Sequence, residues 1–281
     1  MMSSLVFRDD LLRAQVAVVS GGGSGIGRVI ALELATLGAE VVICGRREGP
    51  LLDTAALDPL GRIETAVCDI REEAQVEVLV DRVLEAHSHI DLLVNNAGGQ
   101  FLAPAEEITP KGFHTVMRLN VEGTWLMTHA VATKAMIPAG GGKIVNITLS
   151  PHHGMPGMAH SGAARAAVEN MTRTLSIEWA RHGILCNAIA PGQIGTETML
   201  TKYPKQVVDM VAGTIPLGRL GRAEEIAWMV AYLASPAGDF TTGSVITIDG
   251  ARDNWLGQWP PQWGVDETGK PVAEERREGS T

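Results

Sequence analysis

The feature that most constrains the fold is a glycine-rich turn between an apolar run and a helical pattern near the start of the chain. The run Val16-Ala-Val-Val19 leads into Ser20-Gly-Gly-Gly-Ser-Gly-Ile-Gly27, and helical periodicity follows at once. Gly21 allows a sharp turn, Gly25 allows the backbone to approach a ligand, and Gly27 allows close packing of the helix on the sheet. The free N–H groups at the start of that helix suit a pyrophosphate. We therefore expect a dinucleotide site, with a bare structural turn as the plain alternative.

Short apolar runs alternate with longer helical patterns along the whole chain. We expect strands at residues 14–20, 40–44, 63–68, 92–94, 143–147, 185–190 and 244–248. We expect helices at residues 25–37, 72–87, 110–137, 161–181 and 223–233. This β-α-β alternation predicts an α/β fold, with a doubly wound parallel sheet covered by helices on both faces. The length of 281 residues fits one large domain of this class.

The amino-acid composition of the sequence changes after Gly250. Trp255, Trp259 and Trp263 are interleaved with Pro260 and Pro261, and a charged tail occupies residues 267–281. We expect a core domain over residues 1–250 and an extension over 251–281 whose charged tail is disordered. The tryptophans either cover a bound acyl chain, contact another subunit or simply pack as part of the extension.

Composition excludes several classes of partner. The net charge of −9 argues against nucleic acid as the main partner. The chain has no apolar run near the roughly 20 residues that a membrane span needs. Residues 1–13 lack a signal-peptide core, and the chain does not end in a Ser-Lys-Leu address. We therefore expect a soluble, cytoplasmic protein.

The cysteines and histidines do not form a recognisable metal or disulfide pattern. Cys44, Cys68 and Cys186 are odd in number and widely spaced, which is typical of buried thiols in a reducing compartment. His152, His153 and His160 lack the ligand spacing of a zinc site, so we expect no metal.

Charged residues after the second and third expected strands point to a particular nucleotide. Arg46 and Arg47 follow Val41-Val42-Ile43-Cys44-Gly45, where two guanidinium groups suit the 2′-phosphate of NADP. The alternative is a pair of solvated surface charges. Asp69 follows the third expected strand, where its carboxylate can accept from the adenine amino group. The turn Asn95-Asn96-Ala97-Gly98-Gly99 follows the fourth.

These pieces, in this order, resemble the short-chain dehydrogenase/reductase family over residues 14–250, which implies a Rossmann-type fold, an NADP(H) cofactor and a homotetramer. Asn120 resembles the family's helix asparagine that anchors a water in a proton relay, and Pro191-Gly192 begins a segment similar to the one that holds the nicotinamide carboxamide. Segments 219–226 and 242–250 resemble the family's closing helix and strand. The cofactor contacts implied are Gly21, Ser24, Gly25, Ile26, Gly27, Arg46, Arg47, Asp69, Ile70, Asn96, Ala97, Gly98, Arg165, Pro191, Gly192, Ile194 and Thr196.

The chain departs from the family at its acid–base pair. Most members carry Tyr-x-x-x-Lys on a helix, where the lysine holds the ribose and lowers the tyrosine pKa. Here Ser161 occupies the tyrosine position and Arg165 the lysine position, and the only tyrosines of the chain, Tyr203 and Tyr232, lie elsewhere. The family's catalytic serine corresponds to either Thr148 or Ser150.

This substitution suits reduction of a C=C bond conjugated to a thioester better than reduction of a ketone. A serine hydroxyl has too high a pKa to act as a phenol, and an arginine cannot relay protons as lysine does. Hydroxyls can still stabilise an enolate oxygen in an oxyanion hole while the α-carbon is protonated later. Residues 95–107 and 160–165 resemble the peroxisomal-type trans-2-enoyl-CoA reductases, which implies NADPH and acyl-CoA substrates. The expected catalytic residues are Asn120, Thr148, Ser150, His160, Ser161 and Arg165.

Two other functions remain open from the sequence. One is a carbonyl or alcohol oxidoreductase of the same family that acts on lipid or terpenoid alcohols. The other is a catalytically weak NADP-binding protein that serves as a sensor or scaffold. The three differ in their products: a saturated thioester, an alcohol, or none.

Overall fold

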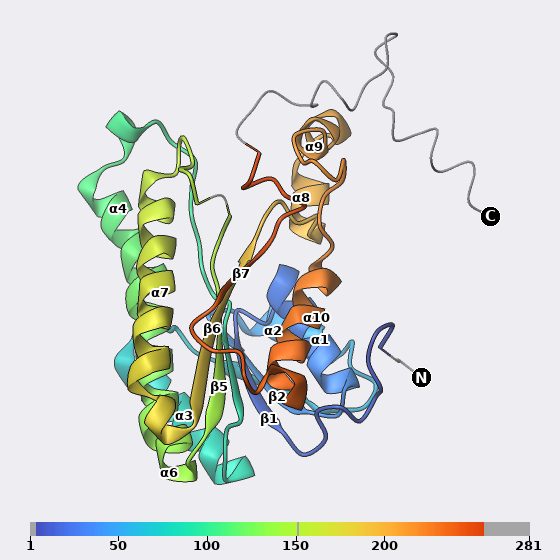
Figure 1. The fold of residues 1–281 in the computed structure, drawn as a ribbon, viewed down its shortest axis with the longest axis vertical. Helices are drawn as coiled ribbons and strands as arrows, with labels where there is room; N and C mark the ends of the chain where they lie inside the picture. The colour runs from blue at the N-terminus through green and yellow to red at the C-terminus, as the bar shows by residue number, and fades with distance from the viewer. Residues whose placement is uncertain (1–3, 151, 256–281) are drawn as a thin grey trace, which may run out of the picture.

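Seven parallel strands form the centre of the molecule. The computed structural model describes residues 4–150 and 152–255. The strands lie in the order β3-β2-β1-β4-β5-β6-β7; Figure 1 shows the sheet between its two layers of helices. Their bounds are β1 Val16–Ser20, β2 Glu40–Gly45, β3 Ile63–Val67, β4 Leu92–Asn95, β5 Gly142–Ile147, β6 Ile184–Pro191 and β7 Val245–Ile248. The strand order reverses between β1 and β4, and open parallel sheets bind ligands at such a reversal.

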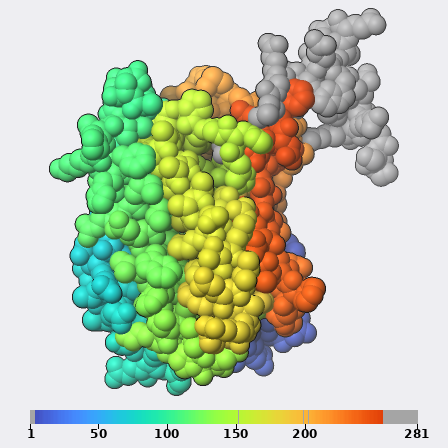
Figure 2. Space-filling view, turned by 60° about the vertical axis from the view of Figure 1, so that its left-hand side comes forward, coloured from blue at the N-terminus to red at the C-terminus, as the bar shows by residue number. Residues whose placement is uncertain are grey.

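Helices cover both faces of the sheet. One face packs against α1 (Gly25–Thr36), α2 (Glu48–Ala55) and α10 (Ala223–Ala234), around buried residues such as Leu34 and Ile226. The other face packs against α3 (Glu73–His87), α5 (Gly123–Val131) and α7 (Ala159–Glu178), around Met127 and Leu175. Figure 2 shows α7, in yellow, along the face turned to the viewer. The doubly wound fold is thereby confirmed.

The strands begin and end close to their expected positions, with one instructive difference. The first strand begins at Val16 rather than at residue 14. Ala14 has a φ of 66°, a left-handed conformation that the extended backbone of a strand does not allow. Ala14 is apolar, as are the strand residues that begin at Val16, but at Ala14 the chain is still turning into the sheet.

The expected helix at residues 110–137 is divided in the structure. It comprises α4 (Pro110–Met117), a π-helical stretch Arg118–Glu122, α5, a second π-helical stretch Ala132–Met136 and α6 (Ile137–Ala139). Asn120 lies in the first of these stretches, and its Nδ2 donates to the carbonyl oxygens of Val116 and Gly99 at 2.9 and 2.8 Å. π-Bulges often occur at functional sites.

Two short helices, α8 (Glu197–Lys202) and α9 (Lys205–Ala212), follow β6 and were not expected from the sequence. Thr196 caps α8, because its side chain accepts a hydrogen bond from the backbone N–H of Met199. Figure 1 shows both helices beyond the ends of the strands, above α10.

Within the described residues, no helix is both long and apolar enough to cross a membrane. The boundary expected at residue 250 stays a prediction. Trp259, Trp263 and the charged tail at 267–281 lie outside the described residues.

Candidate nucleotide and substrate site

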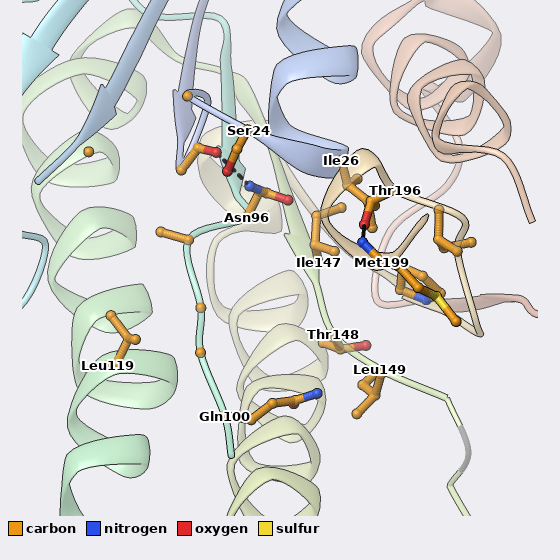
Figure 3. Close-up of a pocket in the computed structure, with 18 of the residues that line it drawn as sticks. Ser24, Ile26, Asn96, Gln100, Leu119, Ile147, Thr148, Leu149, Thr196 and Met199 are labelled. Atoms are coloured by element: carbon orange, nitrogen blue, oxygen red, sulfur yellow. Dashed lines mark hydrogen bonds between the residues drawn. The ribbon is translucent and has the colours of Figure 1, made fainter. Parts of the chain in front are cut away.

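A cavity of about 850 Å³ lies beyond the carboxyl ends of the strands (Figure 3). Of the cofactor contacts expected from the sequence, all but Gly25 and Gly27 line it: Gly21, Ser24, Ile26, Arg46, Arg47, Asp69, Ile70, Asn96, Ala97, Gly98, Arg165, Pro191, Gly192, Ile194 and Thr196. The fold thus brings together residues from six separate segments of the chain. Gly25 and Gly27 shape the turn beside the cavity.

The glycine turn after β1 has no room for side chains. Gly21 has a φ of 70°, and a Cβ there would lie 2.9 Å from the Cα of Ala97. A Cβ on Gly27 would collide with the Gly21 carbonyl oxygen. Ser24, the N-cap residue of α1, makes no side-chain capping bond. The first N–H groups of α1 therefore remain available to an anion on this turn.

Positive charge gathers at one end of the cavity. Arg46 and Arg47 are exposed at its rim, and neither forms an ion pair with another of the described residues. Asp69 is already paired, because it accepts from Arg71 Nε at 2.9 Å and from Arg71 Nη2 at 2.5 Å. The hydrogen bond to Arg71 lowers the pKa of Asp69, against the opposing effect of its partial burial. The two free guanidinium groups suit a phosphate.

Arg165 crosses the floor of the cavity from α7. Its Nη1 donates to the Ile147 carbonyl oxygen at 3.0 Å, while its Nε is buried without a partner among the described residues. Burial lowers the pKa of Arg165 to about 10, so the guanidinium stays charged at neutral pH. A Cβ on Gly98 would lie 2.5 Å from Arg165 Nη2 and 2.6 Å from Asn120 Oδ1. This residue must be glycine for the arginine to reach the cavity.

Ser161 and His160, at the start of α7, are fully buried and do not line the cavity. The Ser161 hydroxyl donates to Gln100 Oε1 at 2.5 Å. The Ser161 backbone N–H donates to His160 Nδ1 at 2.9 Å, which leaves Nε2 as the protonated nitrogen of a neutral ring. That Nε2 is buried and has no partner among the described residues, and the ring packs edge-on against Phe101.

Thr148, rather than Ser150, reaches the cavity wall. Its hydroxyl lies 3.1 Å from Glu169 Oε1 and 3.3 Å from the Ile189 carbonyl oxygen. The hydroxyl of Ser150 donates instead to Asp249 Oδ2 at 2.7 Å, away from the cavity lining. The sequence left Thr148 and Ser150 as alternatives for the family's catalytic serine, and of these two only Thr148 lines the cavity.

Behind Thr148 lies a row of ionisable side chains in contact with one another, which the sequence did not indicate. Glu169 is buried on α7, and His152 Nε2 lies 3.0 Å from its Oε1. His152 Nδ1 lies 2.5 Å from Asp253 Oδ2. Burial opposes protonation of His152, but the hydrogen bond to Asp253 and the charge of Glu169 raise its pKa. Desolvation likewise opposes ionisation of Asp253, yet its bonds to His152 lower its pKa.

Several cavity residues were missed in the sequence. Gln100 lines the cavity, as do Met199, Tyr203, Val207 and Val211 of the α8–α9 segment. The apolar residues of α9 recur at helical spacing, which could have identified an amphipathic helix but not its position over the site. Tyr203, one of the two tyrosines, thus lines this cavity and is 47% exposed.

Comparisons with known proteins agree with this geometry. A family model described as enoyl-(acyl carrier protein) reductase matches residues 21–251. The chain belongs to the short-chain dehydrogenase/reductase family, as the sequence predicted.

Individual relatives carry several activities in their names. A probable 2,4-dienoyl-CoA reductase of Bacillus subtilis (strain 168) is 33% identical over 89% of this chain and 100% of its own length. The structure of a citronellol catabolism dehydrogenase of Pseudomonas aeruginosa PAO1 is 42% identical, with a TM-score of 0.79 over 88% of this chain and 98% of that one. A variant of actinorhodin polyketide ketoreductase, solved with NADPH, is 30% identical, with a TM-score of 0.82 over 86% and 98%.

We expect the bond between His152 and Asp253 to stabilise the fold most in mildly acidic solution. The pKa of His152 is raised in the folded protein. Its contribution to the free energy of unfolding is therefore complete below the pKa of the unfolded chain, about 6.5, and is lost as pH rises through the pKa of the folded protein. Because the pKa of Asp253 is lowered, its contribution is present above about 3.9 and is lost as pH falls through the folded value. The fall in Tm of His152→Gln should therefore be largest at about pH 5.5.

Melting curves of wild type and variant across this pH range check the expectation. His153→Gln, at the neighbouring exposed histidine, is the matched control and should show a smaller effect. A loss of Tm that does not change with pH would assign His152 a role in packing instead.

Proposed function

We propose that this protein uses NADPH to reduce the conjugated C=C bond of trans-2-enoyl-CoA-type acyl thioesters. The observation that carries the proposal is the acid–base position on α7. Ser161 stands there with its hydroxyl buried, and Arg165 stands one turn further along. Neither group equips the site to protonate an alkoxide, whereas a C=C reduction needs only donors for an enolate oxygen. The relatives named dienoyl-CoA reductases support the same substrate class.

The residues that surround the cavity fit NADP(H). The glycine turn and the start of α1 suit the pyrophosphate, Arg46 and Arg47 suit the 2′-phosphate, and Arg165 suits the nicotinamide ribose. The unpartnered Nε of Arg165 is a buried donor that a ribose hydroxyl would satisfy. When bound, NADPH supplies a hydride.

The chain's own groups then determine where charge develops. Addition of a hydride at the β-carbon moves the electron pair of the C=C bond toward the thioester, and negative charge forms on its oxygen. The Gln100 amide, on the cavity wall near Thr148, can donate to that charge, and the apolar residues Met199, Val207 and Val211 line the cavity where the acyl chain would lie. A proton from water at the α-carbon completes the saturated thioester.

The deciding experiment compares products. Purified protein with NADPH is supplied with trans-2-enoyl-CoA thioesters of increasing chain length, beside the matching aldehydes and ketones. We expect NADPH consumption with the thioesters and a saturated acyl-CoA by mass spectrometry. Alcohol products alone would refute the proposal. Nucleotide binding without any turnover would instead indicate a sensor or scaffold.

A second candidate function is the oxidation of alcohols or the reduction of carbonyls. It is favoured by the likeness to the citronellol catabolism dehydrogenase and to the polyketide ketoreductase. Tyr203, at the cavity, is the one phenol placed to serve as an acid in such a reaction. The same product analysis separates the two functions.

We expect Arg46 and Arg47 to set the preference for NADPH over NADH. A charge-assisted hydrogen bond is worth about 1.5–3 kcal/mol, so replacing both residues by serine should weaken NADPH binding by at least about tenfold. Affinity for NADH should stay unchanged, because it lacks the 2′-phosphate. Titration by fluorescence measures both constants, and Arg82→Ser, an exposed arginine on α3, is the matched control. Equal losses for the two nucleotides would contradict a role in phosphate recognition.

We also propose a homotetramer in the cytoplasm. Large apolar side chains remain exposed on the face formed by α4, α5 and α7: Phe113 at 40%, Trp125 at 40% and Ile177 at 78%. Surfaces of this kind mark subunit contacts. Light scattering should give the mass of four chains for the wild type and a smaller mass for Ile177→Glu; a monomeric wild type would refute this assembly.

A further inference from the structure

Two of the three cysteines of the chain are neighbours beside the nucleotide cavity. Cys44 lies on β2 opposite Ala66, and Cys68 follows β3 two residues beyond Ala66. Because side chains two residues apart point to the same face of a strand, both thiols lie on one face of the sheet, within one group of buried residues. Cys68 also lines the cavity. The pair is therefore placed where a small molecule in the cavity can reach one of its two sulfur atoms.

A hydrogen bond between the two thiols makes them chemically unequal. It is the main cause that lowers the pKa of Cys68, against the opposing effects of burial and of the Asp69 carboxylate. The same bond is the main cause that raises the pKa of Cys44, and burial adds to it. Cys44 therefore keeps its proton, while Cys68 more readily becomes a thiolate, which is the form of a cysteine that reacts with oxidants.

The backbone of both cysteines holds parts of the nucleotide site in place. The Cys44 carbonyl oxygen accepts from the N–H of Gly21, in the glycine turn, at 2.8 Å. The Cys68 N–H donates to the Gly45 carbonyl oxygen at 2.9 Å, and Asp69 follows directly along the chain. A change in the distance between the two cysteines would therefore displace groups that line the cavity.

The third cysteine differs from this pair in every respect. Cys186 lies on β6, and it is not among the described residues that line the cavity. Burial raises the pKa of its thiol to about 12. Its sulfur accepts a weak hydrogen bond from Asn146 Nδ2 at 3.9 Å. It is a buried and unreactive thiol, and it provides an internal control for the other two.

From this arrangement we infer that Cys44 and Cys68 form a reversible disulfide when hydrogen peroxide reaches the nucleotide-free protein, and that this disulfide weakens nucleotide binding. The Cys68 thiolate attacks the peroxide, so that an S–O bond forms, the O–O bond breaks and hydroxide leaves. The Cys44 sulfur then attacks the resulting sulfenic acid; an S–S bond forms, the S–O bond breaks and a second hydroxide leaves. The protons of the two thiols convert both hydroxides to water.

The effect on the nucleotide follows from the register of the two strands. Cys44 and Cys68 lie diagonally across β2 and β3 rather than directly opposite each other. Closing an S–S bond of about 2 Å therefore draws the end of β3 toward β2. That movement displaces Asp69 and the backbone that supports Gly21. A nucleotide in the cavity would in turn cover Cys68 and keep the peroxide away from it.

Peptide mapping by mass spectrometry after peroxide treatment tests the bond directly. Without nucleotide we expect peptides that contain Cys44 and Cys68 to become linked, and saturating NADP⁺ added beforehand should prevent the link. The oxidised protein should bind NADP⁺ about tenfold or more weakly, which corresponds to loss of one charge-assisted hydrogen bond. Dithiothreitol should restore the affinity, whereas it leaves oxidised methionines unchanged.

Single substitutions separate the two chemical steps. Cys44→Ala should stop at a sulfenic acid on Cys68, which dimedone traps, and Cys68→Ala should give neither that adduct nor the link. Cys186→Ala is the matched control and should form the link as the wild type does. Mapping of the wild type needs no variant, so the inference stays testable even if a substitution prevents folding.

The outcomes also keep this inference apart from the proposed function. Cysteines that stay as free thiols in the peroxide-treated wild type overturn the inference, and so does a link that leaves NADP⁺ affinity unchanged or forms equally with NADP⁺ bound. None of these measurements needs a substrate, so failure to reduce thioesters does not affect them. If the reduced protein binds NAD⁺ in place of NADP⁺, the proposed cofactor is wrong, and the same titration with NAD⁺ decides the inference.

Discussion

The hydroxyl of Ser20 ties the ends of β1 and β4 together at the point where the strand order reverses. It accepts from the backbone N–H groups of Asn96 and Ala97, each at 3.1 Å. These two bonds hold the turn after β4 against the glycine turn after β1, where a Cβ on Gly21 would lie 2.9 Å from the Cα of Ala97. The cavity opens from this contact, so both the nucleotide turn and the residues that follow Gly98 are positioned by it.

The reactive end of the cavity is organised by buried polar groups rather than by an exposed acid. Burial lowers the pKa of Arg165 to about 10, so it remains charged at neutral pH; its side chain bonds to the end of β5 and passes beside Gly98. The Ser161 hydroxyl is used inside the protein, and so is that of Thr148. Such a site favours stabilisation of an oxyanion over direct proton transfer to a carbonyl oxygen.

Much of the fold could be predicted from the sequence because short apolar runs bounded by turns are strongly constrained in a parallel sheet. Helices α2, α8 and α9 were not expected, and the helix expected at 110–137 is divided. The helix at 110–137 contains π-helical stretches at Arg118–Glu122 and Ala132–Met136, and no residue type in the sequence marks such short changes of winding. Helices α8 and α9 are short, and what they cover depends on the rest of the fold.

The sequence by itself determined the nucleotide turn, the arginine pair and the identities of Ser161 and Arg165, because these depend on residue type and on spacing within one segment. Only the tertiary structure decided that Ser161 is covered by Gln100, 61 residues away, and that Thr148 rather than Ser150 reaches the cavity. It also decided that the side chains of Glu169, His152 and Asp253 are linked by hydrogen bonds. Those contacts join segments distant in sequence, and side-chain packing across the folded sheet selects them.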